Sequence, residues 1–156
     1  MGQVGYLKIS KDGKTVIGHE IGFKGAAVIP DGVTMIDNDA FSYCDDLTSI
    51  QIPYSVIEIE NAAFDGCSRL KEIVVDNNNI IYCSEDGVLY SKYMSRLITV
   101  PEAKKSLDIP NGVTEIGERA FNRCINLLSI KIPSSMTEIG GVDIQGVYRT
   151  KEHSCG

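Results

Sequence analysis

The sequence predicts a solenoid, a mainly β chain in which short units of constant length stack on one another. The first observation is a motif, Ala-Phe-x-x-Cys-x-x-Leu, which occurs at 40–47, 63–70 and 120–127. The second is its period, since Phe41 and Phe64 are 23 residues apart. A fixed period in the twenties is typical of architectures in which each unit packs only against its neighbours.

A longer period lies above the first. Phe41 and Phe121 are 80 residues apart, and the segment 9–17 lies 81 residues before 90–98. Both segments have the pattern of two short strands around a polar turn. We therefore expect a hairpin followed by two units, and then the same arrangement again.

Each unit has a simple physical pattern, which is clearest from Leu47 to Cys67. Ile50 and Ile52 alternate with polar residues, as in a half-buried strand. Pro53 ends the strand because proline cannot donate a hydrogen bond to a neighbouring strand. Ala63 and Phe64 are expected on a short helical turn, with the ring filling the space between strand and return path.

The repeat positions explain most of the aromatic and sulfur-containing residues. We expect one buried aromatic row of Phe41, Phe64 and Phe121. Cys44, Cys67 and Cys124 should form a parallel row of small, weakly donating thiols at the next turn. Stacking could bring Cys44 and Cys67 within disulfide range, but repeat position already accounts for both, so reduced thiols are the favoured interpretation.

Composition excludes several classes of protein. The chain has 156 residues, the length of one ordinary domain, and a net charge of −6, which argues against a nucleic-acid partner. It has no apolar run long enough to span a membrane. The N-terminus has no pattern of a signal peptide, which fits a cytosolic protein or a chain whose export signal lies elsewhere.

The sequence contains no motif for catalysis or for a cofactor. It has no C-x-x-C, G-x-S-x-G, H-E-x-x-H or P-loop pattern, so we expect no enzyme, no cofactor and no metal site. Asp76 to Asn79 has the composition of a turn rather than a calcium loop. A hypothesis of another class is a reactive thiol, Cys83 or Cys155, paired with a histidine.

The unit from Leu47 to Cys67 resembles the BspA-type, or Treponema pallidum type, leucine-rich repeat, and 77–110 resembles a segment common in that family. The resemblance covers 26–140. It implies a leucine-rich repeat solenoid that is mainly β with short helical turns. It also implies a parallel sheet on a concave face, β-hairpin insertions, and a surface or secreted protein that binds other proteins without catalysis.

Repeat spacing and this resemblance together divide the chain into five parts. The last repeat is degraded, because Ile144 and Val147 replace the expected Phe and Cys. The parts are an N-terminal hairpin or cap (1–25), two repeats (26–75), a hairpin insertion (76–103), two repeats of which the last is degraded (104–147), and a divergent C-terminal tail (148–156).

The candidate binding residues are the outward positions of the predicted strands. They form a chemically mixed row, which suits a protein partner without naming one. They are Ser49, Gln51, Glu72, Val74, Asp108, Ser129 and Lys131. The alternative is a structural spacer whose only task is to set a distance.

The C-terminal end is a second candidate surface. Solenoids need polar caps, and we find none in this part of the sequence. We therefore expect self-association through the C-terminal edge, or further repeats that cover it. The apolar residues concerned are Leu127, Ile130, Ile132, Met136 and Ile139.

Overall fold

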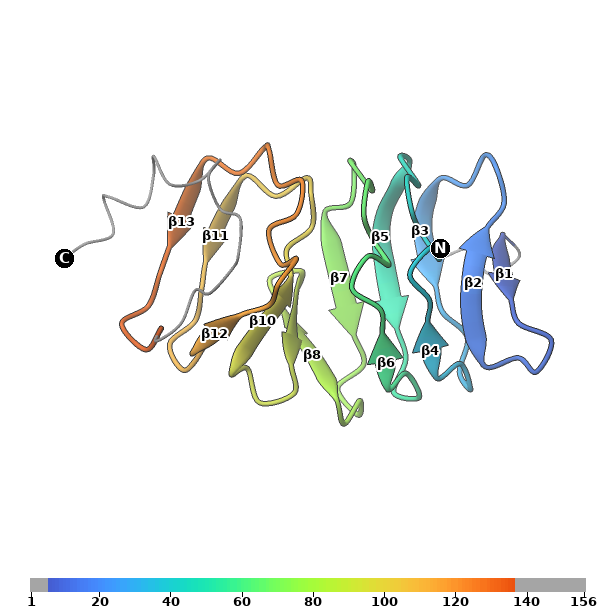
Figure 1. Ribbon diagram of the computed structural model, residues 1–156, viewed down its shortest axis with the longest axis horizontal. Helices are drawn as coiled ribbons and strands as arrows, with labels where there is room; N and C mark the ends of the chain where they lie inside the picture. Colours follow the sequence, from blue (N-terminus) through green and yellow to red (C-terminus); the bar gives the residue numbers. More distant parts are fainter. Residues whose placement is uncertain (1–5, 137–156) are drawn as a thin grey trace.

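The computed structural model describes residues 6–136 of the chain, and all structural statements below refer to them. Figure 1 shows the strands side by side along the long axis of the molecule, from β1 at one end to β13 at the other. They form two layers, which we call the long-strand layer, after β5, its six-residue strand, and the return layer. The solenoid predicted from the 23-residue period is confirmed.

The long-strand layer contains two parallel sheets. The first has the order β3-β5-β7 and the second the order β11-β13. The bounds are β3 (Gly25–Val28), β5 (Leu47–Ile52), β7 (Glu72–Val75), β11 (Ser106–Asp108) and β13 (Ser129–Lys131).

The return layer contains two four-stranded sheets, each built on a hairpin. Their orders are β1-β2-β4-β6 and β12-β10-β9-β8. The bounds are β1 (Leu7–Ile9), β2 (Thr15–His19), β4 (Met35–Ile36), β6 (Glu58–Ile59), β8 (Tyr82–Glu85), β9 (Val88–Ser91), β10 (Arg96–Thr99) and β12 (Glu115–Ile116).

The two hairpins have the same register. In the first, Lys8 pairs with Gly18 and Ile9 pairs with Val16, so the register shifts between Lys8 and Ile9. In the second, Leu89 pairs with Thr99 and Tyr90 with Leu97, across the same irregularity. Each residue of the first set lies 81 positions before its counterpart, so the longer period of the sequence has a structural equivalent.

The short helical turns that we expected are wrong for the described residues, which contain no helix. The segment around Phe41 makes four-residue turns instead, from Ala40 N–H to Asp37 C=O and from Cys44 N–H to Phe41 C=O. The residue before each repeat cysteine then takes a positive φ, which ends the turn. These residues are Tyr43 (56°), Gly66 (80°) and Arg123 (59°).

The apolar side chains form two cores, so the prediction of a single aromatic row is wrong. Phe41 and Phe64 stack in the first core with ring centroids 5.8 Å apart, and the His19 ring stacks on Phe41. Phe121 belongs to the second core. The hairpin insertion separates the cores, and Val100 lies beside the third unit where a phenylalanine would continue the row, with its N–H bonded to the Ala120 carbonyl.

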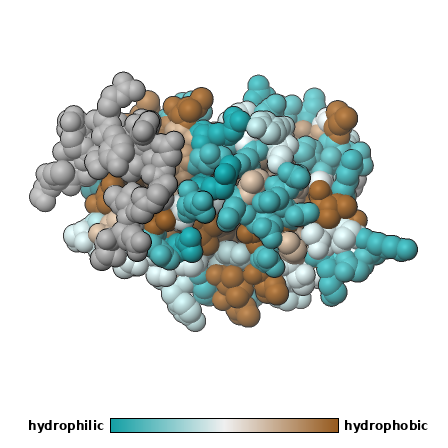
Figure 2. Space-filling view, viewed as in Figure 1, coloured by the Kyte–Doolittle hydropathy of each residue, from teal (hydrophilic) through white to brown (hydrophobic). Residues whose placement is uncertain are grey.

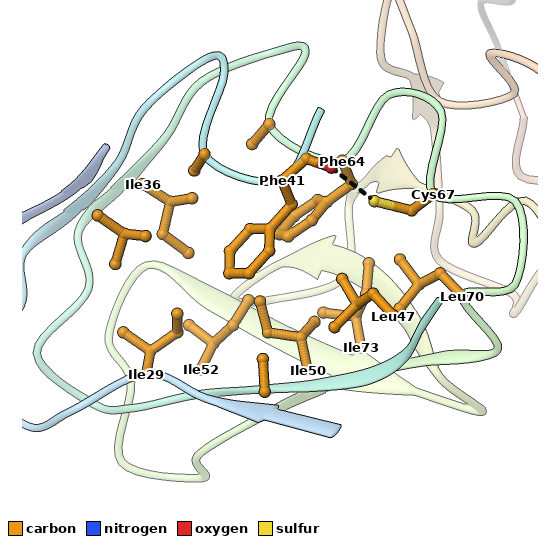
Figure 3. Close-up of a cluster of buried hydrophobic side chains, with 14 of the residues drawn as sticks. Ile29, Ile36, Phe41, Leu47, Ile50, Ile52, Phe64, Cys67, Leu70 and Ile73 are labelled. Atoms are coloured by element: carbon orange, nitrogen blue, oxygen red, sulfur yellow. Dashed lines mark hydrogen bonds between the residues drawn. The ribbon is translucent and has the colours of Figure 1, made fainter. Parts of the chain in front are cut away.

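The predicted row of thiols is divided in the same way, with Cys44 and Cys67 in the first core and Cys124 in the second. Two of these thiols link neighbouring units. Figure 3 shows the Cys67 thiol reaching the Phe41 carbonyl, with Phe41 and Phe64 packed over Ile50. The Cys67 Sγ lies 3.0 Å from that oxygen, and the Cys124 Sγ lies 3.5 Å from the Val100 carbonyl. The Cys67 thiol is thus a second donor to the Phe41 carbonyl, which also accepts from the Cys44 N–H within its own turn.

A buried asparagine anchors the hairpin insertion. The Asn79 side chain is fully buried, and its Nδ2 donates to the carbonyls of Pro53 and Val56. Its Oδ1 accepts from the N–H groups of Ile81 and Tyr82. This agrees with the sequence interpretation of 76–79 as a turn, and Asp76 supports the same turn by accepting from the Asn78 N–H.

Candidate functional site

The seven candidate binding residues lie on one face, which we call the long-strand face: the outer side of β3-β5-β7 and β11-β13. Ser49 pairs with Glu72, and Gln51 pairs with Val74. In the second sheet, the same two rows continue as Ser129, which pairs with Ser106, and as the pair Asp108 and Lys131. Six of the seven are exposed and Ser49 is half-buried. Period-two alternation explains this, because the intervening Ile50, Ile73, Leu107 and Ile130 point into the cores.

The long-strand face has a first hollow where β3, β5 and β7 end. Its volume is about 180 Å³. Gln51 lies at its centre and Val74 lies on one side. Two exposed carboxylates, Asp31 and Asp76, stand in the lining.

The hairpin tip interrupts the face between the two parallel sheets. The Ile73 N–H donates to the Gly87 carbonyl, and the Val75 N–H donates to the Ser84 hydroxyl, so the tip lies along β7. Gly87 has a φ of 77°, and a Cβ there would come within 2.8 Å of the Glu72 Cβ. Glycine is therefore needed both for the turn and for the close approach.

A second hollow, of about 550 Å³, lies on the other side of the tip. The 80-residue period of the sequence explains its position, since Asp108 and Lys131 stand 80 residues after Val28 and Gln51 of the first hollow. Its outer wall is acidic and comes from the hairpin. The charged lining residues are Glu85, Asp86, Asp108 and Lys131.

The charges of this second hollow are only partly neutralised. Lys104 binds Asp86 with an Nζ to Oδ2 distance of 3.0 Å. Within 6–136, neither Glu85 nor Asp108 belongs to an ion pair. Burial raises the pKa of the Tyr90 hydroxyl, and the nearby carboxylates of Glu85, Asp86 and Asp108 raise it further. Three of the four charged residues in the lining are thus acidic.

Sequence reasoning missed Glu85 and Asp86, because the insertion was interpreted only as a hairpin and not placed against the strands. The signal available was the Asp86-Gly87 pair, which is typical of a tight hairpin turn. It did not indicate that the turn reaches the long-strand face. That placement depends on tertiary contacts with β7.

A second exposed surface is apolar. Figure 2 shows a hydrophobic patch at the lower edge of the molecule, below β6 and β8 in the view of Figure 1. The turns beside these strands carry exposed Ile57, Ile80 and Ile81. The patch lies on the return layer, and we use it below as a comparison surface.

The described thiols have the properties of core residues. Burial raises the pKa of Cys44 to about 11 and that of Cys124 to about 12, and it also raises the pKa of Cys67 and Cys83. A raised pKa lowers the thiolate fraction on which nucleophilicity depends. Among the described residues, no group of three His, Cys, Asp or Glu side chains could hold a metal ion.

The structure does not pair the described histidine with a thiol. His19 Nδ1 donates to the Ala40 carbonyl at 3.0 Å, and the Cys83 thiol donates to the Ser91 carbonyl. Cys155 and His153 lie outside the described residues, as do Ile139, Ile144 and Val147. Of the predicted C-terminal edge, Leu127 and Ile130 are buried, and Ile132 and Met136 are partly buried against the second core.

The repeats match a known family model, the BspA type leucine rich repeat region, with six copies over residues 25–102 and 101–146. The chain belongs to the BspA-type leucine-rich repeat family. Leucine-rich repeat domains generally bind proteins, and this family and its fold are typically non-enzymatic. A search among curated proteins finds no match.

Solved structures of leucine-rich repeat proteins have the same fold. One from Eubacterium ventriosum is 29% identical, with a TM-score of 0.63 over 72% of this chain and 31% of that chain. A leucine rich cell surface protein from Faecalibacterium prausnitzii is 32% identical, with a TM-score of 0.51 over 72% and 36%. A T. pallidum leucine-rich repeat protein is 23% identical, with a TM-score of 0.54 over 94% and 69%.

The BspA-type chain is thus similar to about a third of the length of the first two of these proteins. One of the neighbours is described as a cell-surface protein. Within the described part of the chain, we find no helix that is long and apolar enough to cross a membrane.

Proposed function

We propose that this BspA-type repeat module binds a protein partner through its long-strand face, without catalysis, as part of a cell-surface or secreted protein. The observation that carries the proposal is the register of the outward residues. Gln51 and Val74 stand side by side on one sheet, and Asp108 and Lys131 stand side by side on the next. All four residues are solvent-exposed, and each pair lines one of the two hollows.

The size of the face supports a protein partner. Five strands and a hairpin tip, taken at the usual spacing of about 4.8 Å between paired strands, would span about 25 Å. An extended segment of about eight residues crosses that distance. The hollows would receive its side chains, while the apolar strand residues beneath hold the face rigid.

The experiment is a selection followed by blocking variants. A phage-displayed library of random twelve-residue peptides is selected on the immobilised protein, and the affinity of each binder is measured for two double variants. Gln51→Tyr with Val74→Tyr adds neutral bulk to the long-strand face. The matched control, Ile57→Tyr with Ile80→Tyr, adds the same rings to the apolar patch of the return layer.

We expect the first pair to weaken binding at least tenfold and the control pair to change it less than twofold, with both variants melting like the wild type. A tenfold loss corresponds to about 1.4 kcal/mol of binding free energy. Binders that respond only to the control pair would contradict the proposal. A spacer predicts that the selection yields no binders at all.

A further inference from the structure

We infer that the segment bound by the long-strand face is basic, and that a lysine or arginine of the partner enters the hollow beside the hairpin tip. This inference rests on the proposed function and adds the chemical class of the partner. It concerns the second hollow, of about 550 Å³, lined by Glu85, Asp86, Asp108 and Lys131.

The charge balance of the two hollows carries the inference. Together their linings hold five carboxylates, from Asp31, Asp76, Glu85, Asp86 and Asp108, against a single ammonium group, that of Lys131. All five acidic residues are exposed, so they interact with an incoming ligand rather than with the core. Only Asp86 among them belongs to an ion pair within 6–136.

The position of these carboxylates is fixed by the fold. Gly87 holds the tip against β7, because its carbonyl accepts from the Ile73 N–H and because no side chain would fit beside Glu72. Lys104, which is largely buried, holds Asp86 from behind. Glu85 and Asp108 therefore both line the hollow on supported backbone, and neither belongs to an ion pair among residues 6–136.

A cation delivered on a chain fits this arrangement better than a metal ion. No three acidic, cysteine or histidine side chains of residues 6–136 could hold a metal. Carboxylates that are distributed over two hollows can instead bind several basic side chains of one partner segment. Arginine and lysine side chains form charge-assisted hydrogen bonds with carboxylates. Oppositely charged surfaces also steer encounter and fix the register of the bound segment.

The test uses the same peptide selection with charge variants of the full chain. Glu85→Gln with Asp108→Asn removes two charges from the second hollow. The control, Glu20→Gln with Glu118→Gln, removes two exposed charges outside the hollows. The two double variants therefore have the same net charge. A third variant, Lys131→Gln, removes the only cation in the lining. Affinities are measured in 150 mM salt, which screens distant charges beyond about 8 Å.

We expect selected sequences to be enriched in lysine and arginine. Their affinity should fall at least tenfold with Glu85→Gln and Asp108→Asn, fall less than twofold with Glu20→Gln and Glu118→Gln, and rise with Lys131→Gln. Equal losses from the two double variants would overturn the inference, since the attraction would then depend on net charge alone.

The outcomes also separate this inference from the proposed function. Binders that lack basic residues, yet lose affinity with Gln51→Tyr and Val74→Tyr, would overturn the basic specificity and leave the binding face standing. Binders insensitive to every variant on the long-strand face would overturn both.

Discussion

The ring of Tyr43 lies directly over the backbone of Gly66 in the next unit. A Cβ built on Gly66 would come within 2.5 Å of the Tyr43 Cδ1. The ring also meets Arg123, whose guanidinium carbon lies 5.1 Å from the ring centroid and whose Nη2 donates to the tyrosine hydroxyl at 2.9 Å. All three occupy the same repeat position, so the joint between the two halves of the solenoid depends on one residue having no side chain.

Gly66→Ala tests this joint. Its φ of 80° costs an alanine about 1–2 kcal/mol, and the overlap with Tyr43 adds about 1–3 kcal/mol, so we expect a loss of about 3 kcal/mol in the free energy of unfolding. Urea unfolding measures it. Gly32→Ala is the control, because Gly32 has a φ of 95° but open space around it, and should cost only the backbone part. Equal losses in the two variants would contradict the proposed overlap.

Asn79→Ala should remove the anchor of the hairpin insertion. It would leave the carbonyls of Pro53 and Val56 and the N–H groups of Ile81 and Tyr82 without their side-chain partner. Each unsatisfied buried group costs about 1–3 kcal/mol, so we expect a loss of at least about 3 kcal/mol. Thermal unfolding by circular dichroism is the measurement. Asn78→Ala, at an exposed neighbour, should change little, and a similar loss there would show that the anchor is misassigned.

Glu102→Gln should make the protein more stable at neutral pH. Burial raises the pKa of this carboxyl above its ordinary value of 4.5, although the Gly66 N–H and Arg123 oppose the shift. A raised carboxyl pKa favours folding below about 4.5 and disfavours it as the pH rises through the folded-state pKa. Gln keeps an oxygen for the Gly66 N–H and carries no charge.

The stability difference between Glu102→Gln and the wild type should therefore be favourable at pH 7, shrink as the pH falls through the folded-state pKa, and level off near pH 4.5. Urea midpoints measured across that range provide the test. Glu118→Gln, an exposed change, should give a flat difference. If the advantage of Glu102→Gln grew on acidification instead, the burial of the charge would not be the dominant effect.

The four described thiols should react slowly with a disulfide reagent in the native protein. Burial raises the pKa of each, and Cys83 is the least buried of them. Because the thiolate is the reacting species, Cys83 should be modified first, and the other three should follow only as the protein unfolds. Mass spectrometry of partly modified samples identifies the order. Early labelling of Cys67 would contradict its place in the core.

The repeats could be predicted from the sequence because the same residue types recur at a constant spacing. Period-two alternation around Ile50 and the stop at Pro53 predicted β5 and its outward residues, and the 81-residue spacing predicted the second hairpin. The prediction failed where the unit is interrupted. Phe121 was assigned to the row of Phe41, because spacing alone does not show that an insertion lies between the two cores.

The acidic part of the candidate site was missed for a related reason. Glu85 and Asp86 belong to a hairpin of the return layer, and the contacts of Ser84 and Gly87 with β7 bring them to the long-strand face. Such a contact joins two different repeat positions, so no periodicity contains it. Ala63 and Phe64 were expected on a short helical turn, but Gly66, with a φ of 80°, ends the turn after Phe64. At the equivalent position of the preceding unit stands Tyr43, a residue type that gives no sign of its positive φ.

The most direct test of the binding face is a chemical-shift map. A peptide from the selection is titrated into isotope-labelled protein, and the backbone amide signals are followed. We predict shifts at Gln51, Val74, Asp108 and Lys131, with the tip residues Glu85 and Asp86 among the largest. Shifts confined to the turns that carry Ile57, Ile80 and Ile81 would contradict the account and assign binding to the apolar patch of the return layer.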